Sequence, residues 1–229
     1  MATKKHYMVL DTETVADARV PFDLGFTTID RHGNIVEQRN FFTAEIVDNP
    51  TGLYLLCKDS FSRRKAAFYL KAAKEQPQNV MPFDIIADII NDKIDEYNAT
   101  VCAYNAKFDV TVCENFAQAL GMPYFFTPGI EVWDIWNIAL NIFCKSRNYV
   151  NFARKNGFVT EKNNVSSSAE TVYRYLTNDP AFIESHTALD DTNIEAEILT
   201  QAFKRHKTLV TEFAGAMFHH PIWKQYLRG

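Results

Sequence analysis

Short apolar runs and turn-forming residues alternate along the first part of this chain. Residues 6–10 form an apolar run that ends at Asp11, as a buried strand would. Residues 24–30 and 35–43 are two further strand candidates, with the turn-forming pair Gly33-Asn34 between them. Strands joined by so short a connection pair antiparallel, so an antiparallel unit is predicted here.

Apolar residues recur at helical spacing in much of the remaining chain. The segment 51–76 is one predicted helical region, and Pro82 begins another helix at a position that suits proline. Residues 100–104 form a short buried strand that leads into a helix ending near residue 120. Further predicted elements are a strand at 131–134 and helices at 135–143, near 169–177, and from shortly after His186 to about residue 207. Three antiparallel strands followed by alternating helices and strands predict an α/β architecture in one domain.

The composition fits a globular domain and shows no membrane segment. Of 229 residues, 47% are hydrophobic and 18 are Phe, which is ample for a sizeable core. No apolar run approaches the ~20 residues that cross a membrane, and the first residues lack the apolar stretch of a signal peptide. Four cysteines form no C-x-x-C pair, which indicates buried thiols in a reducing compartment. We therefore expect a cytoplasmic protein with no membrane partner.

Charge is distributed unevenly along the chain. The formal net charge of −4 is unlike that of a protein that coats nucleic acid, although a local basic patch would suffice for an enzyme. The segment 51–76 carries most of its charges as Lys and Arg, and it contains three aromatic candidates for stacking on bases, Phe61, Phe68 and Tyr69. A path for a phosphate backbone and a solvated helix face are equally consistent with this pattern.

The strongest local signal for chemistry is the segment 10–14, Leu-Asp-Thr-Glu-Thr, at the end of the first strand. Residues two apart on a strand share a face, so Asp11 and Glu13 direct two carboxylates toward one point. Carboxylate oxygens are the ligands that Mg²⁺ and Mn²⁺ prefer. A solvated strand end is the better explanation of such a pair when it stands alone, so its meaning depends on the other segments.

Two later segments supply further candidates. Asp109 follows the strand at 100–104, at a crossover of the kind where ligands gather in α/β sheets, although a carboxylate there also suits a helix N-terminus. His186 stands shortly before a helix, and Asp191 lies near the start of that helix. An imidazole can accept a proton at neutral pH. Together with the segment 10–14, these residues indicate one acidic site.

The three segments, in this order, resemble the DEDDh family of 3′–5′ exonucleases, which includes polymerase proofreading subunits, ribonuclease T and oligoribonuclease. The family motif D-x-E-T stands here at 11–14, its asparagine shortly before F-D at 105–109, and its H-x-A-x-x-D at 186–191. The resemblance covers roughly residues 6–200. It implies a ribonuclease H-like α/β fold: a mixed sheet with its first three strands antiparallel and its later strands parallel, flanked by helices.

The resemblance also implies the chemistry and its site. Two divalent ions, Mg²⁺ or Mn²⁺, would be held by Asp11, Glu13, Asp109 and Asp191. His186 would take a proton from the water that attacks the terminal phosphodiester at a single-stranded 3′ end of DNA or RNA. Nucleoside 5′-monophosphates would be released. The candidates for contacts with this nucleic acid are Thr12, Thr14, Asn105 and Phe108, with packing beneath the site as the alternative for the phenylalanine.

Some residues depart from the family pattern. Tyr104 stands where relatives have histidine. Asp190 competes with Asp191 as a ligand, and we choose Asp191 because it fits the family spacing. Asp134 resembles an element that supports the site, so we do not expect it to be a ligand.

The segments 45–80 and 145–167 are interpreted as insertions into a single exonuclease domain that spans 1–229. Residues 208–229 are interpreted as a helical C-terminal extension, and its aromatic residues could form a homodimer interface or cover the core.

Two other functions stay open at this point. One is an inactive nucleic-acid-binding or adaptor domain of the same fold, against which the presence of all five expected side chains counts. The other is a metal-dependent phosphohydrolase that acts on a small nucleotide. The basic segment 51–76 would not be needed to bind such a small substrate. No residue can be assigned to the 2′-hydroxyl, so the sequence does not discriminate RNA from DNA.

Overall fold

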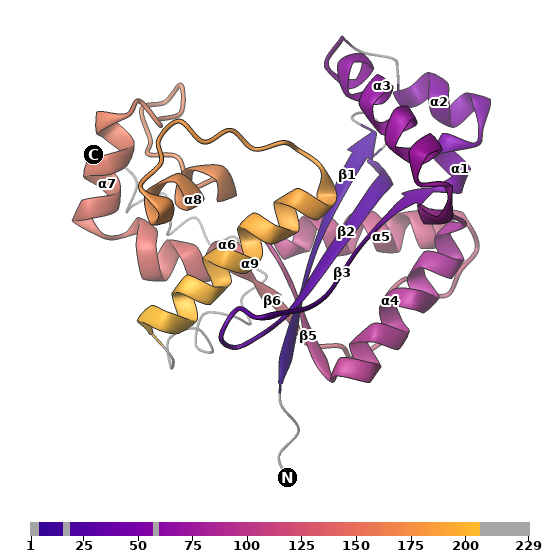
Figure 1. The fold of residues 1–229 in the computed structure, drawn as a ribbon, viewed down its shortest axis with the longest axis horizontal. Helices are drawn as coiled ribbons and strands as arrows, with labels where there is room; N and C mark the ends of the chain where they lie inside the picture. Colours follow the sequence, from indigo (N-terminus) through magenta and orange to yellow (C-terminus); the bar gives the residue numbers. More distant parts are fainter. Residues whose placement is uncertain (1–4, 16–18, 57–59, 207–229) are drawn as a thin grey trace.

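A six-stranded sheet crosses the centre of the computed structural model, which describes residues 5–15, 19–56 and 60–206 (Figure 1). The strand order is β4-β3-β2-β1-β5-β6. The strands are β1 (His6–Val15), β2 (Val20–Asp30), β3 (Ile35–Thr43), β4 (Val80–Met81), β5 (Ala99–Ala103) and β6 (Val132–Asp134). β2 is antiparallel to both β1 and β3, whereas the β1–β5, β5–β6 and β3–β4 pairs are parallel. The mixed sheet expected from the sequence is therefore confirmed.

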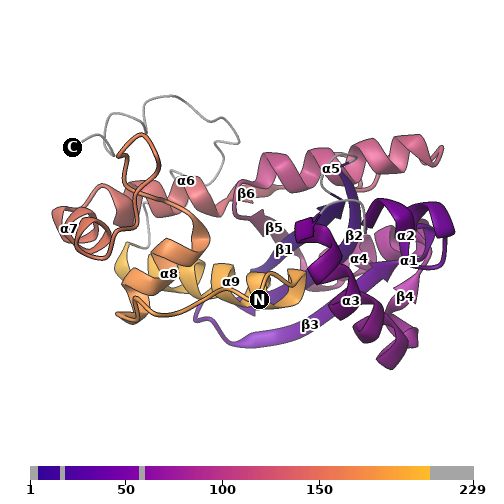
Figure 2. The ribbon, with the colours of Figure 1, turned by 90° about the horizontal axis from the view of Figure 1, so that it is seen from above.

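Helices cover both faces of this sheet (Figures 1 and 2). On one face lie α4 (Phe83–Tyr97) and α5 (Ala106–Ala119). On the other lies α9 (Ala188–Arg205), with α6 (Ile135–Ala139), a π-helical turn (Leu140–Cys144), α7 (Arg147–Lys155) and α8 (Ala169–Thr177). A third group, drawn at the upper right of Figure 1, comprises α1 (Ala44–Val47), α2 (Pro50–Leu56), α3 (Ser60–Glu75) and a 3-10 turn (Pro77–Asn79).

Two hydrophobic cores form because successive residues of a strand face opposite sides of the sheet. In β1, Tyr7 and Val9 are buried in the core shared with α6 and α9. Met8 and Leu10 alternate with them and are buried in the core shared with α4 and α5. The apolar run that predicted this strand is thus buried on both faces, as expected for a strand in the middle of an α/β sheet.

A third core lies at the end of the sheet where β1 and β3 end and β2 begins. It joins Val15 and Phe22 to Ala66, Tyr69 and Ala73 of α3. The segment 45–80, interpreted as an insertion, therefore packs directly on the ends of the strands. This contact matters below because the first strand ends at the candidate site.

The structure adds detail to several expected elements. The described residues of the segment 51–76 form α2 and α3, as the helical prediction for this segment expects. Ser168 caps α8 by accepting a hydrogen bond from the Thr171 N–H at 3.3 Å. β4 was not predicted, because a strand of two residues leaves no readable pattern.

The polar segment 145–167 is more than a loop. It contains α7, whose buried Tyr149 and Ala153 are spaced by one helical turn. Two buried positions in a polar segment are too few to reveal a helix by periodicity. The expected C-terminal helix at 208–229 lies outside the described residues.

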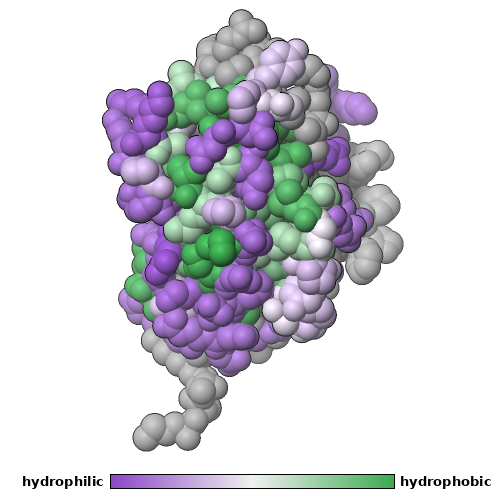
Figure 3. All heavy atoms as spheres, turned by 90° about the vertical axis from the view of Figure 1, so that its right-hand side faces the viewer, coloured by the Kyte–Doolittle hydropathy of each residue, from purple (hydrophilic) through white to green (hydrophobic). Residues whose placement is uncertain are grey.

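The surface described here is polar with scattered apolar side chains. Figure 3 shows hydrophilic and hydrophobic residues interspersed on the face that lies to the right in Figure 1. Exposed large apolar residues include Tyr54 of α2 and Phe68 of α3, which are 67% and 56% exposed. Within the described part of the chain, no helix has both the length and the apolar character required to span a bilayer.

Candidate active site

Asp11 and Glu13 continue the row of β1 residues that faces α9. Tyr7 and Val9 of this row are buried in the core under α9, and a period of two places the two carboxylates next in line. The pairing of β1 with β2 shifts register between Glu13 and Thr14. Irregularities of this kind re-aim side chains at the end of a strand. The carboxylates are therefore presented where the apolar core ends.

Asp109 reaches the same place from α5. Because β5 is parallel to β1 and pairs with it, α5 begins beside the end of β1. Asp109 is buried, and the Thr12 hydroxyl donates a hydrogen bond of 2.8 Å to its Oδ1. Burial raises the pKa of Asp109 above its ordinary value, and this hydrogen bond opposes the rise.

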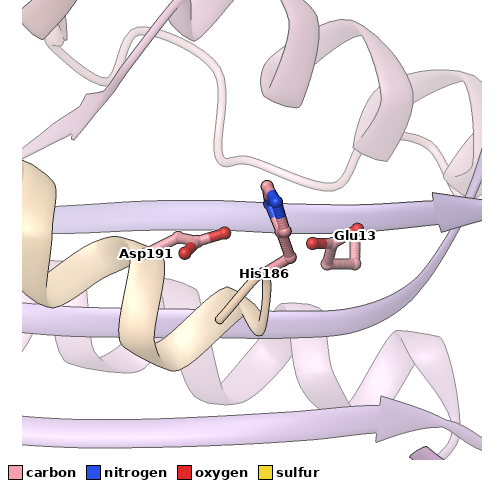
Figure 4. Close-up of side chains that lie close together, drawn as sticks. All are labelled: Glu13, His186 and Asp191. Atoms are coloured by element: carbon pink, nitrogen blue, oxygen red, sulfur yellow. The ribbon is translucent and has the colours of Figure 1, made fainter. Parts of the chain in front are cut away.

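His186 and Asp191 come from the segment that opens α9 (Figure 4). Figure 4 shows the carboxylates of Glu13 and Asp191 on either side of His186. One potential ligand atom of each of these three residues lies within 4.8 Å of the others. Asp190 is exposed, and its carboxylate accepts a hydrogen bond of 2.9 Å from the Thr187 hydroxyl. The structure thus places Asp191, and not Asp190, beside Glu13.

The clustered carboxylates concentrate negative charge. The pKa of Asp11 is held well above its ordinary value, first by burial and then by the charges of Glu195, Asp109, Asp191 and Glu13. Like charges this close repel each other unless protons or cations lie among them. Hard carboxylate oxygens suit Mg²⁺ and Mn²⁺. The donor set therefore fits divalent ions.

The backbone around His186 is constrained. His186 has a φ of +56°, in the left-handed region that costs a residue with a side chain about 1–2 kcal/mol. The Tyr69 hydroxyl donates a hydrogen bond to the His186 carbonyl oxygen. The Ala188 N–H donates to Oδ2 of Asp23 at 3.1 Å. The His186 Nδ1 lies 3.7 Å from Oε2 of Glu184. The loop is thus held by α3 on one side and by β2 on the other.

The four predicted substrate contacts occupy different settings. Thr12 is buried with its hydroxyl on Asp109, whereas Thr14 is half-buried. Asn105 and Phe108 line a cavity of about 310 Å³ beside the start of α5, together with Arg19, Lys107, Thr111, Val112 and Asn115. The Asn105 N–H donates to Oδ1 of Asp134 at 3.2 Å, which agrees with a supporting role for that carboxylate. Contact with a substrate stays a prediction for all four residues.

Sequence reasoning missed several residues that adjoin the site. Glu195 is 4% exposed, and its Oε2 accepts a hydrogen bond from the Tyr104 N–H at 3.0 Å. Its position four residues after Asp191 on α9 could have identified it, since such residues share a helix face. Asp23 stands between the apolar residues Phe22 and Leu24 of β2, which was a readable signal too. Glu184, two residues before His186, had no sequence signal that could have identified it.

The suggestion that Tyr69 stacks on bases is wrong. Tyr69 is 1% exposed, because its ring packs edge-on against Phe22 with centroids 4.7 Å apart. Its neighbour Phe68 has the opposite orientation and is exposed. The two residues are neighbours in α3 and therefore lie on different faces of the helix, one buried and one exposed.

Comparisons with known proteins find similarity at the level of structure. No protein-family model matches the sequence, and no curated protein matches it. Exonuclease I of E. coli in complex with a dT13 oligonucleotide superimposes with a TM-score of 0.58 and 16% identity, covering 91% of this chain and 43% of that chain. A complex of the same enzyme with a dA16 oligonucleotide gives a TM-score of 0.59 and 17% identity, covering 91% of this chain and 42% of that chain.

A zinc-bound form of an E. coli Exonuclease I complex with single-stranded DNA is similar to the same degree, with a TM-score of 0.58, 16% identity and coverage of 91% of this chain and 42% of that chain. This chain spans less than half the length of the Exonuclease I chains it matches. The structural similarity shows the fold of this chain. At so low a sequence identity, it does not show the activity. The chain therefore has the fold of the Exonuclease I structures, with the mixed sheet that the sequence predicts.

Proposed function

We propose that this chain is a metal-dependent 3′–5′ exonuclease that acts on single-stranded nucleic acid. The observation that carries the proposal is the convergence of Glu13, His186 and Asp191, with Asp11 and Asp109 beside them, on the fold of Exonuclease I. These residues come from three distant segments, each of which matches a motif of the DEDDh family. The Exonuclease I structures hold single-stranded oligonucleotides, so DNA is the first substrate to test.

The chain's own residues divide the work of hydrolysis. Two divalent ions, Mg²⁺ or Mn²⁺, would be held by Asp11, Glu13, Asp109 and Asp191. When bound, such ions supply positive charge to the scissile phosphate and increase the acidity of water. His186 is half-exposed and has space to accept the proton of the attacking water. Attack at the terminal phosphodiester releases a nucleoside 5′-monophosphate.

We place the nucleotides next to the scissile bond in the cavity beside α5. Phe108 and Val112 give it an apolar wall, while Arg19 and Lys107 bring two positive charges to its lining. A nucleotide offers a flat apolar base and an anionic phosphate, which these two kinds of side chain complement. Asn105 and Phe108 of the second motif are among the residues that line this cavity.

The test is a time course on 5′-labelled single-stranded DNA and RNA of the same sequence, with Mg²⁺, Mn²⁺ or EDTA. We expect a metal-dependent ladder that shortens from the 3′ end. Asp11→Ala and Asp191→Ala should abolish it without unfolding the protein, because each removes a carboxylate of the cluster. His186→Ala should slow it by about 10²–10⁴-fold while binding persists.

Other outcomes would redirect the assignment. Binding of both strands without any ladder indicates a nucleic-acid-binding domain of this fold. Absence of binding as well indicates a small nucleotide as the substrate. An unchanged rate for His186→Ala across pH 6–9 would exclude its role as the base.

A further inference from the structure

The carbonyl of His186 is held by a residue from outside the three motifs. Tyr69 lies in α3, 117 residues earlier in the chain, and its hydroxyl donates a hydrogen bond to that carbonyl oxygen. Burial, together with the charges of Glu13 and Asp23, raises the pKa of Tyr69 far above its ordinary value. The hydroxyl therefore stays protonated and remains a donor. This bond connects the segment 45–80 to the candidate base.

The same short loop is fixed on its other side by β2. The Ala188 N–H donates to Oδ2 of the buried Asp23, 165 residues away in sequence. A Cβ added to Gly25 would lie 2.5 Å from the backbone of Ala188 and Leu189, so β2 and the start of α9 are in close contact. With β2 on one side and α3 on the other, the backbone of residues 186–188 is held between two elements.

The conformation of His186 explains why such support is needed. Its φ of +56° is one that residues with side chains rarely adopt, so the loop would relax if its carbonyl lost its partner. The imidazole itself is 48% exposed, and its Nδ1 lies 3.7 Å from Oε2 of Glu184. With little packing around the ring, the backbone sets its direction. A rotation of the His186 carbonyl would therefore move the imidazole relative to Glu13 and Asp191.

A purely structural role for Tyr69 makes a different prediction. Its ring fills the core beside Phe22 and Ala66, and a phenylalanine would fill that space equally well. If Tyr69 only packs, loss of the hydroxyl should leave catalysis unchanged. If it holds His186, loss of the hydroxyl should affect the step that His186 performs.

We propose that Tyr69 is a positioning residue for His186, so that the segment 45–80 completes the active site instead of only extending the substrate path. The proposal rests on the exonuclease function proposed above. It places Tyr69 in contact with the backbone of the base and not with the substrate.

The variant Tyr69→Phe tests this with steady-state kinetics on a single-stranded oligonucleotide. We expect kcat to fall by about 10–100-fold, because a small misplacement of a reacting group has an effect of that size. KM and the Kd for Mn²⁺ should stay within about twofold of wild type. Tyr149→Phe is the matched control, since it removes a hydroxyl of α7 that likewise donates to a backbone carbonyl, that of Ser166 at 2.8 Å, and it should keep the wild-type kcat.

A double-mutant cycle shows whether the effect passes through His186. In a His186→Ala background, Tyr69→Phe should cause no further loss, because the two changes remove the same contribution. An equal loss in both backgrounds would overturn the proposal, as would a wild-type kcat for Tyr69→Phe alone.

Hydrogen exchange of the metal-free protein provides a readout that does not depend on activity. The Ala188 amide should exchange faster in Tyr69→Phe than in wild type or Tyr149→Phe, while amides in the middle of β1 stay unchanged. Unaltered exchange at Ala188 would refute the structural part of the proposal. If the wild-type protein degrades no strand yet this exchange difference is found, the proposed function fails and the support of the loop by Tyr69 stands.

Discussion

At the residue scale, buried acids stand out because they keep protons that exposed acids lose. Asp23 is 1% exposed, and its pKa is raised from 3.8 to about 7, chiefly by burial, although the Ala188 N–H opposes the rise. Between those two pKa values the folded protein holds a proton that the unfolded chain has released. The contribution of Asp23 to stability is therefore fully present below about pH 4 and is lost as the pH rises to about 7.

The variant Asp23→Asn should remove this pH dependence, because an amide does not ionise and can still accept the Ala188 N–H. In EDTA, we expect its stability relative to wild type to rise from pH 4 to pH 8, on the order of 1.4 kcal/mol for each unit of the lost shift. Thermal or urea unfolding at a series of pH values measures this. Asp48→Asn, at an exposed carboxylate, is the control. Parallel curves for wild type and Asp23→Asn would contradict the assignment.

At the element scale, the start of α9 is fixed by its close approach to β2. Gly25 pairs with Asp11 across the strands, and a Cβ on Gly25 would lie 2.5 Å from backbone atoms of Ala188 and Leu189. Backbone atoms cannot move aside as the end of a long side chain can. The absence of a side chain at this position therefore allows α9 to bring Asp191 to the carboxylates of β1.

Replacing Gly25 by Ala should displace the start of α9. We expect a loss of about 1–3 kcal/mol in the free energy of unfolding, as in other overpacked sites, together with a fall in exonuclease kcat/KM. Gly129→Ala is the control. A Cβ there meets nothing within 4 Å, so this substitution causes no clash and tests only the cost of placing a side chain at a φ of +92°. If both variants keep wild-type activity, the contact between β2 and α9 does not position the site.

At the scale of the whole molecule, an acidic protein has to bind a polyanion through local charge. The net charge is −4, and the carboxylate cluster adds to the repulsion of a phosphate backbone. Lys107 and Phe108 line the cavity that also contains Arg19, and they directly precede Asp109 of the cluster in α5. Binding of a strand should then depend on a few contacts near the site and not on the overall charge.

Salt dependence tests this distribution of charge. Each phosphate contact to a single strand contributes about −0.7 to the slope of log affinity against log salt. Lys107→Gln should therefore make the slope of log kcat/KM shallower by about that amount. Lys155→Gln, at an exposed position on α7, should leave it unchanged. Identical slopes for wild type and Lys107→Gln would remove Lys107 from the substrate path.

Much of the fold and the core of the site could be predicted because their signals are local. The apolar run at 6–10 predicted β1, and the Gly33-Asn34 turn predicted the antiparallel pairing of β2 with β3. The five motif residues could be named because each motif occupies a few consecutive positions. α7 and β4 could not be predicted. α7 is a polar helix with two buried positions, and β4 has only two residues.

The amino-acid sequence by itself determined most of the helices and strands and the side chains that the three motifs supply. Only the tertiary structure decided that Tyr69, Asp23 and Glu195 adjoin the site. The physical reason is the range of the interactions. Periodicity reports which face a residue lies on, whereas the contacts of Tyr69 with His186 and of Asp23 with Ala188 join residues 117 and 165 positions apart, which meet only once the sheet has assembled.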